Sequence, residues 1–197
     1  MTLLLTLRGT PFMYYGEEIG MRDISLSRSE IMDPPGKKYW PIYKGRDGCR
    51  SPMQWSNARY AGFSTFQPWL KVHPNYVLRN VSAQQEDPNS LLNFTQRLIA
   101  LRRRHAALRD GSFNKILQQD KNILAYERTQ VDECVQIYIN FSGDSRQGQF
   151  SRDADDQSAV ILLDNGNRKG LSVRNNQFVL APHEILVLRV KSLAIRD

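Results

Sequence analysis

The feature that most constrains the fold is residues 22–86, a long stretch with neither the period of a helix nor the alternation of a strand. It contains six prolines, which interrupt regular structure, and all three tryptophans of the chain, Trp40, Trp55 and Trp69. An irregular segment of this length inside a compact protein is usually functional. We therefore predict an ordered functional loop, whose aromatic side chains anchor it to a neighbouring surface.

The residues before this loop predict one step of a parallel sheet. Residues 1–8 favour a helix that ends at Gly9, and the apolar residues 12–15 favour a short buried strand. A helix, a tight turn and an all-apolar strand are typical of α/β proteins with parallel sheets. One such strand has unpaired edges and closes no core, so this part is not expected to be a domain by itself.

The residues after the loop predict a helix and then a β-rich region. Asp87 followed by Pro88 predicts a helix start, and apolar residues at helical spacing continue to Leu108, before Gly111. The polar residues 144–156 are predicted to be a loop. The predicted strands are 113–117, 122–128, 135–141, 159–164, 171–173, 177–180 and 184–190. Short strands at this spacing are typical of an antiparallel β-sandwich.

The chain therefore divides into two predicted parts, residues 1–112 from an α/β protein and residues 113–197 as an all-β sandwich. A complete (β/α)8 barrel alone takes roughly 250 residues. A chain of 197 residues has no room for such a barrel and a second domain. Residues 1–112 are thus not expected to contain a complete barrel.

Composition excludes several classes of protein. The net charge is +7, and residues 1–118 hold 17 Lys and Arg against 9 Asp and Glu, but no motif for binding nucleic acid accompanies this excess. We predict neither a nucleic-acid partner nor a membrane partner, since residues 1–8 are too short to span a bilayer. Cys49 and Cys134 form no disulfide framework, which favours a reducing compartment and hence the cytoplasm.

Several motifs in order resemble bacterial α-glucosidases of the α-amylase superfamily. Residues 7–21, LRGTPFMYYGEEIGM, resemble the eighth barrel strand and the loop after it, and residues 45–55, GRDGCRSPMQW, resemble a signature of the same group. Shorter matches follow at residues 61–64, 68–69 and 80–84, and residues 87–103 resemble the eighth barrel helix. The β-rich region is similar to the C-terminal domain of that family. The resemblance implies the end of a (β/α)8 barrel followed by a β-sandwich.

The resemblance implies retaining hydrolysis of terminal α-linked glucose from oligosaccharides. Such chemistry needs a nucleophilic carboxylate and an acid/base carboxylate roughly 5 Å apart. In the family these groups follow earlier barrel strands, so we predict no catalytic residue in this chain and no activity of the chain alone. Glu17 and Glu18 are an unsuitable pair, because adjacent side chains diverge on a strand or a helix. One of them is expected to meet solvent and the other to bind a neighbouring loop.

Two residues are candidates for substrate binding. Arg50 stands where the family's arginine helps close the sugar pocket, and its guanidinium is a rigid fork of donors for hydroxyls or a carboxylate. The alternative is a structural ion pair with Asp47 or another acid of the loop. Glu30 lies in the loop that forms part of the aglycone side in the family. The tryptophans are either anchors of the loop or stacking platforms for a sugar.

The resemblance implies no cofactor and no metal, because the family's calcium sites lie mainly outside the matched part. The expected partners are an oligosaccharide in the full-length enzyme and the missing N-terminal barrel region. The alternative is a non-catalytic sugar-binding or interaction module that assembles with a partner chain. Unpaired strand edges would also favour a homo-oligomer.

Overall fold

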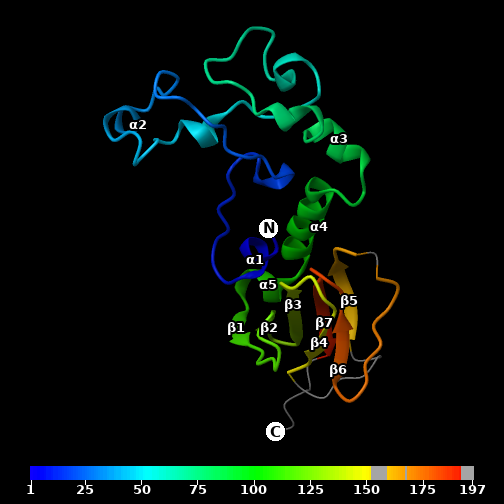
Figure 1. Cartoon of the computed structure of the whole chain (residues 1–197). Helices are drawn as coiled ribbons and strands as arrows, with labels where there is room; N and C mark the ends of the chain where they lie inside the picture. Colours follow the sequence, from blue (N-terminus) through cyan, green and yellow to red (C-terminus); the bar gives the residue numbers. More distant parts are fainter. Residues whose placement is uncertain (152–158, 167, 192–197) are drawn as a thin grey trace. The chain divides into compact units, whose positions relative to one another are not determined.

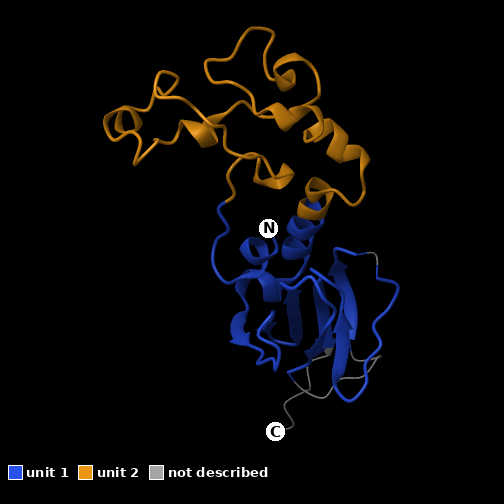
Figure 2. Cartoon of the chain, in the orientation of Figure 1, with its two compact units in different colours: residues 1–12, 96–197 blue, residues 13–95 orange. Residues whose placement is uncertain are grey.

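The chain forms two compact units, residues 1–12 together with 96–197, and residues 13–95 (Figure 2). A computed structural model describes residues 1–151, 159–166 and 168–191. No described helix has the length and apolar character needed to cross a membrane. The domain boundary predicted between residues 112 and 113 stays a prediction.

The first unit contains two antiparallel sheets (Figure 1). A five-stranded sheet has the order β1-β2-β3-β7-β5, and β4 pairs with β6 in a two-stranded sheet. The strands are β1 Ser112–Lys115, β2 Ile123–Gln130, β3 Glu133–Asn140, β4 Arg146–Gln149, β5 Ala159–Asp164, β6 Gln177–Leu180 and β7 Ile185–Lys191. The predicted all-β architecture is thus present.

The two sheets share one apolar core. Leu186, Leu188 and Val190 alternate along β7 and are buried in a cluster with Phe178 and Leu180 of β6. Period-two alternation places these side chains on one face of each strand. Between the sheets, the ring of Tyr138 meets the ring of Phe178 edge-on, with 4.9 Å between centroids. Burial of this apolar surface, at roughly 25 cal/mol per Å², is the main force that holds the sheets together.

Three helices belong wholly or partly to the same unit: α1 Thr2–Thr6, the long α4 Leu91–Arg104, and α5 Ala106–Asp110. α5 packs on β2 and β3, and α1 packs on α5, so both short helices lie at one end of the five-stranded sheet (Figure 1). The predicted helix from Asp87 to Gly111 is therefore two helices. Its continuity breaks at His105, whose backbone is extended (φ −104°, ψ 112°).

A buried arginine joins the helices to the sheet. Arg128 of β2 is fully buried, and its guanidinium donates to the carbonyls of Thr6, Leu108, Gly111 and Ser112 at 2.7–3.1 Å. These carbonyls lie at the C-terminal ends of α1 and α5 and at the first residue of β1. Burial first, and the nearby charge of Arg102 second, lower the pKa of Arg128. One side chain thus satisfies four backbone acceptors, three of them in buried hydrogen bonds.

A carboxylate holds the start of α5. Oε2 of Glu133 accepts the backbone N–H of Ala107 at 2.9 Å, and Oε1 lies 2.5 Å from Nδ1 of the buried His105. Burial alone would raise the pKa of Glu133, but the Ala107 N–H and His105 outweigh it and the pKa is lowered. An ionised carboxylate only accepts, so His105 donates through Nδ1.

Glu133 is therefore expected to make stability pH-dependent. Its pKa is lower in the folded chain, so its contribution is present above the ordinary carboxyl value of 4.5 and is lost as pH falls through the folded value. Glu133→Gln should cost about 1.5–3 kcal/mol near neutral pH, the usual range for hydrogen bonds to charged groups. Urea unfolding at several pH values measures this. The difference should vanish in acid, whereas Asp132→Asn, at the exposed neighbour, should change little.

Several predicted elements differ from the structure. Residues 12–15 belong to no described strand, because a strand exists only where a neighbour completes its hydrogen bonds, and none of the described strands pairs with them. Residues 171–173 form no strand either, although Leu171 and Val173 pack on the core. β4 lies inside the predicted loop 144–156, of which residues 152–156 lie outside the described residues.

The second unit, residues 13–95, is mainly irregular, as predicted for the long loop. Its helices are α2 Pro34–Lys38 and α3 Val81–Glu86, with short 3-10 turns at Glu17–Ile19, Asp47–Arg50, Arg59–Gly62 and Pro74–Val77. A small core contains Ile19, Met53 and Leu92. Polar side chains bind the backbone throughout this unit; for example, Gln84 donates to the carbonyl of Ile19 at 2.8 Å. Such bonds replace the ladders that regular structure would supply.

Candidate functional site

A cavity of about 370 Å³ lies within residues 13–95. Its walls combine one arginine, one carboxylate and four aromatic rings with smaller side chains. They are Tyr15, Glu18, Arg50, Ser51, Pro52, Met53, Trp55, Phe63, Pro68 and Trp69. Its volume is within the range of small-molecule sites, and apolar walls with a few polar groups are typical of such sites.

Arg50 ends the 3-10 turn Asp47–Arg50, and its side chain remains 37% exposed. Its Nη1 lies 3.5 Å from Oδ1 of Asp47 and 3.8 Å from Oδ1 of Asp33. The ion pair with Asp47 that the sequence left as an alternative is therefore present. Both distances are long, and both involve the same nitrogen. The other guanidinium donors keep their capacity for a ligand.

The two acids beside Arg50 are buried within the loop that carries it. Asp47 is fully buried, and its Oδ2 accepts the backbone N–H groups of Met32 at 2.7 Å and Asp33 at 2.8 Å. Burial alone would raise the pKa of Asp47, but these two N–H groups and Arg50 bring it below its usual value. Asp33 is also buried. Neither carboxylate lines the cavity, and the bonds that Asp47 accepts fix the loop that carries Arg50.

The adjacent carboxylates Glu17 and Glu18 have different surroundings. Glu17 is exposed, and its Oε2 accepts the N–H of Tyr14 at 3.2 Å. Glu18 lines the cavity, and its Oε2 is buried without a hydrogen-bond partner among the described residues. A buried acceptor without a donor is costly, so this oxygen favours a donor from a ligand, water or another chain segment.

The aromatic walls are open to solvent. Trp55 is 49% exposed and Trp69 is 66% exposed, whereas Trp40 lies outside this cavity with Lys44 over its ring. Tyr15 donates its hydroxyl to the carbonyl of Ser51 at 2.9 Å, and burial followed by the neighbouring Tyr14 raises the pKa of Tyr15 to about 12. Exposed indole faces suit stacking on a sugar ring, the alternative that the sequence left open for the tryptophans.

Glu30 is not among the residues that line this cavity. Its Oε2 accepts from the N–H and the hydroxyl of Ser27, and its Oε1 lies 3.0 Å from Nζ of Lys71. The Ser27 N–H first, and Lys71 second, lower the pKa of this exposed carboxyl to about 2. The structure thus does not bring the two predicted binding residues into one pocket.

Sequence reasoning missed Tyr15 and Phe63 as lining residues. Both lie in motifs that were recognised, at residues 7–21 and 61–64. Their convergence depends on the path of an irregular loop, which no periodicity encodes.

The described residues contain no cluster of three or more His, Cys, Asp and Glu side chains suited to a metal ion.

Comparison with known proteins identifies the family. Residues 1–111 match the family described as "Alpha amylase, catalytic domain". This chain belongs to the alpha-amylase family. The resemblance inferred from the motifs is thereby confirmed, and the matched part ends where the β-rich region begins.

Relatives in the alpha-amylase family match most of the chain. The "Probable oligo-1,6-glucosidase 2" of Bacillus subtilis (strain 168) is 34% identical over 196 residues, which is 90% of this chain and 34% of that protein. The "Oligo-1,6-glucosidase" of Halalkalibacterium halodurans is 39% identical over 159 residues, covering 72% of this chain and 28% of the relative.

A solved structure of this family has the same fold. The crystal structure of Bacillus licheniformis trehalose-6-phosphate hydrolase matches with a TM-score of 0.81 and 28% identity, over 97% of this chain and 38% of the other. The predicted fold class, a barrel end followed by antiparallel sheets, is confirmed. The chain spans about a third of the length of the relatives it matches.

Proposed function

We propose that this chain is the C-terminal portion of an α-glucosidase, which releases terminal α-linked glucose from oligosaccharides by a retaining mechanism in the cytoplasm. The observation that carries the proposal is the match of 90% of the chain to one third of an oligo-1,6-glucosidase. The Arg50 cavity, with open tryptophan faces and an unpartnered carboxylate oxygen, supports a sugar ligand at this part of the molecule.

The chain alone is proposed to be inactive. Retaining hydrolysis needs two carboxylates about 5 Å apart on either side of the scissile bond. Asp33 and Asp47 lie beside one another but are buried within the loop, and Glu17 and Glu18 have separate surroundings. We therefore assign the nucleophile and the acid/base to the upstream part of the whole protein.

The chain supplies binding and orientation. Arg50 donates hydrogen bonds to sugar hydroxyls or to a carboxylate at the base of the pocket, since the guanidinium keeps its charge at all working pH values. Trp55 and Trp69 offer ring faces to the sugar, and a sugar stacked on them displaces water from the pocket, which strengthens the polar contacts. Glu30 contributes an acceptor on the aglycone side, with its charge maintained by Ser27 and Lys71.

The alternative is a non-catalytic module that assembles with a partner chain. One observation favours assembly, namely the large apolar side chains exposed on the second unit, including Ile42 at 97% and Phe66 at 79%. Monomeric proteins rarely leave many such side chains uncovered. The proposed occupant of this surface is the upstream barrel region of the same enzyme, and a separate chain of the same kind would serve equally.

A chimera tests the proposal. The purified chain should not hydrolyse p-nitrophenyl α-glucoside, because it lacks the carboxylate pair. Fusing it to the upstream two thirds of the Bacillus subtilis relative, in place of that protein's own C-terminal part, should give an active enzyme. Proton NMR of the first product should show the α-anomer, as a retaining mechanism requires.

Two results would overturn the proposal. Turnover by the chain alone would place catalysis in this chain, if two conditions hold. The activity must remain in preparations free of host enzymes, and it must be lost in Glu18→Gln. A chimera that is monodisperse and cooperatively folded but inactive would favour the assembly module. Glu17→Gln is the matched control, because Glu17 is exposed outside the cavity.

A further inference from the structure

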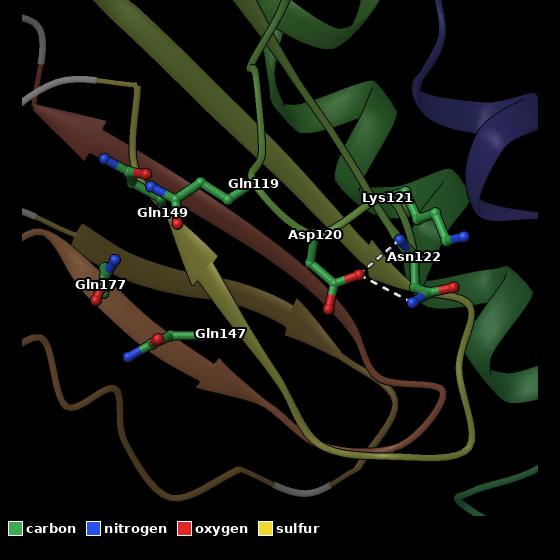
Figure 3. Close-up of a pocket in the computed structure, with 7 residues that line it drawn as sticks. All are labelled: Gln119, Asp120, Lys121, Asn122, Gln147, Gln149 and Gln177. Carbon is green, nitrogen blue, oxygen red and sulfur yellow. Dashed lines mark hydrogen bonds between the residues drawn. The ribbon is translucent and has the colours of Figure 1, made fainter.

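A second groove, of about 490 Å³, lies in the unit that contains the sheets. Five of its seven lining side chains are carboxamides, and the other two are one acid and one amine. Figure 3 shows them: Gln119, Asp120, Lys121, Asn122, Gln147, Gln149 and Gln177. None of these residues lines the Arg50 cavity.

Strand alternation places three of the glutamines together. In the β4–β6 pair, Gln149 lies opposite Gln177, and Gln147 is two residues from Gln149 on the same face. The intervening residues face the core, where Phe178 is buried. The outer face of this two-stranded sheet therefore presents the three glutamines together with the exposed Val179, and the loop before β2 supplies the opposite wall. This groove adjoins the Ile123 end of β2, away from the Arg128 end that binds the helices.

The two walls are held in place by hydrogen bonds. The side chain of Gln118 donates to the carbonyl of Gln149 at 2.7 Å and accepts from its N–H at 2.8 Å. Oδ1 of Asp120 accepts from the N–H and the side-chain amide of Asn122, which closes the turn of the loop. The groove is thus preorganised, and this lowers the entropic cost of ordering it around a ligand.

The available polar groups suit a neutral ligand. The side-chain amides of Gln119, Gln147 and Gln177 have no hydrogen-bond partner among the described residues. Each amide offers two donors and one acceptor oxygen, a match for hydroxyl groups that both donate and accept. The carboxylate of Asp120 is already paired, since its Oδ2 lies 3.5 Å from Nε of Arg146. The remaining lining is five neutral carboxamides and the amine of Lys121, so uncharged donors and acceptors dominate the groove.

An apolar surface adjoins this groove. A neighbouring hollow of about 430 Å³ shares Asp120 and Lys121 with it and includes Leu117, 78% exposed, and Phe141, 59% exposed. Sugar rings present hydroxyl groups at their edges and C–H groups on their faces, so an amide-lined groove beside an exposed ring matches both. We propose that this groove binds a short neutral oligosaccharide, with its hydroxyls at the glutamines and one ring on Phe141. The site goes beyond the proposed function, because it is separate from the Arg50 cavity.

Titration of the full 15N-labelled chain with maltotriose tests the site. Amide shifts should move at residues 119–122, 147, 149 and 177, and Phe141→Ala should weaken the binding. Gln177→Ala should raise the dissociation constant about two- to ten-fold, the range for one neutral hydrogen bond. Gln147→Ala with Gln177→Ala should raise it further. Gln85→Ala, an exposed glutamine of α3, is the matched control and should leave the constant unchanged.

The outcomes separate this site from the Arg50 cavity. Groove shifts that persist in Arg50→Ala and disappear in the double glutamine variant support the proposal. Shifts confined to residues around Arg50, Trp55 and Trp69 would overturn it while supporting the proposed function. Absence of any shift at the solubility limit of maltotriose would also overturn it. The spectra themselves report whether each variant remains folded.

Discussion

Arg128→Met is expected to lower the free energy of unfolding by about 3–5 kcal/mol, because four backbone carbonyls lose their donor and each buried acceptor left unsatisfied costs roughly 1–3 kcal/mol. Methionine fills much of the volume but donates nothing to the carbonyls of Thr6, Leu108, Gly111 and Ser112. Removing the buried charge recovers part of its desolvation cost, which keeps the loss below the sum of four hydrogen bonds. Urea unfolding followed by circular dichroism measures the change.

Two variants separate the hydrogen bonds from general effects of losing an arginine. Arg189→Met removes an exposed arginine from β7 in the same sheet and should change the free energy of unfolding by less than about 0.5 kcal/mol, as is usual for surface positions. Arg128→Lys keeps the charge but loses the fork of donors, so an intermediate loss is expected. A loss of under about 1 kcal/mol in Arg128→Met would contradict the role assigned to this side chain.

The sheet region was predictable where side chains alternate. Residues 159–164 and 177–180 form strands with the predicted bounds, because their apolar residues face a shared core at period two. β4 was missed, because its sequence Arg-Gln-Gly-Gln carries no apolar residue. Its strand exists because Gly148 leaves room for the ring of Phe178: a Cβ at that position would lie 2.9 Å from Cζ. Such a close approach is invisible in the sequence.

The sequence predicted residues of the candidate site but not how their side chains are arranged in space. The sequence selected Arg50 and named Asp47 as an alternative partner, and the structure holds these two side chains 3.5 Å apart. It did not place Tyr15 beside Ser51, because 36 residues of irregular chain separate them and the contact is a single side-chain hydrogen bond. The binding roles of Arg50 and Glu30 remain predictions.

Arg50→Ala in the chimeric enzyme is expected to lower kcat/KM for p-nitrophenyl α-glucoside by about 10- to 150-fold. This corresponds to roughly 1.5–3 kcal/mol, the value of hydrogen bonds from a charged donor to the sugar or its pocket. If the contact forms with the ground-state sugar, KM rises, and if it forms in the transition state, kcat falls with KM unchanged. Steady-state kinetics give this division, and Arg50→Lys should recover only part of the loss, since a point charge lacks the fork.

Arg46→Ala is the matched control for this prediction. Arg46 precedes the same 3-10 turn and binds the same Oδ1 of Asp33, at 3.4 Å, but its side chain is 63% exposed and lies outside the cavity. If Arg50 acts only by tethering the loop through Asp33 and Asp47, the two alanine variants should lower kcat/KM by similar amounts. If Arg50 contacts the sugar, Arg46→Ala should retain nearly full activity, because the loop keeps its shape without Arg46. Arg50→Ala should lose activity, because the pocket then lacks the guanidinium donors.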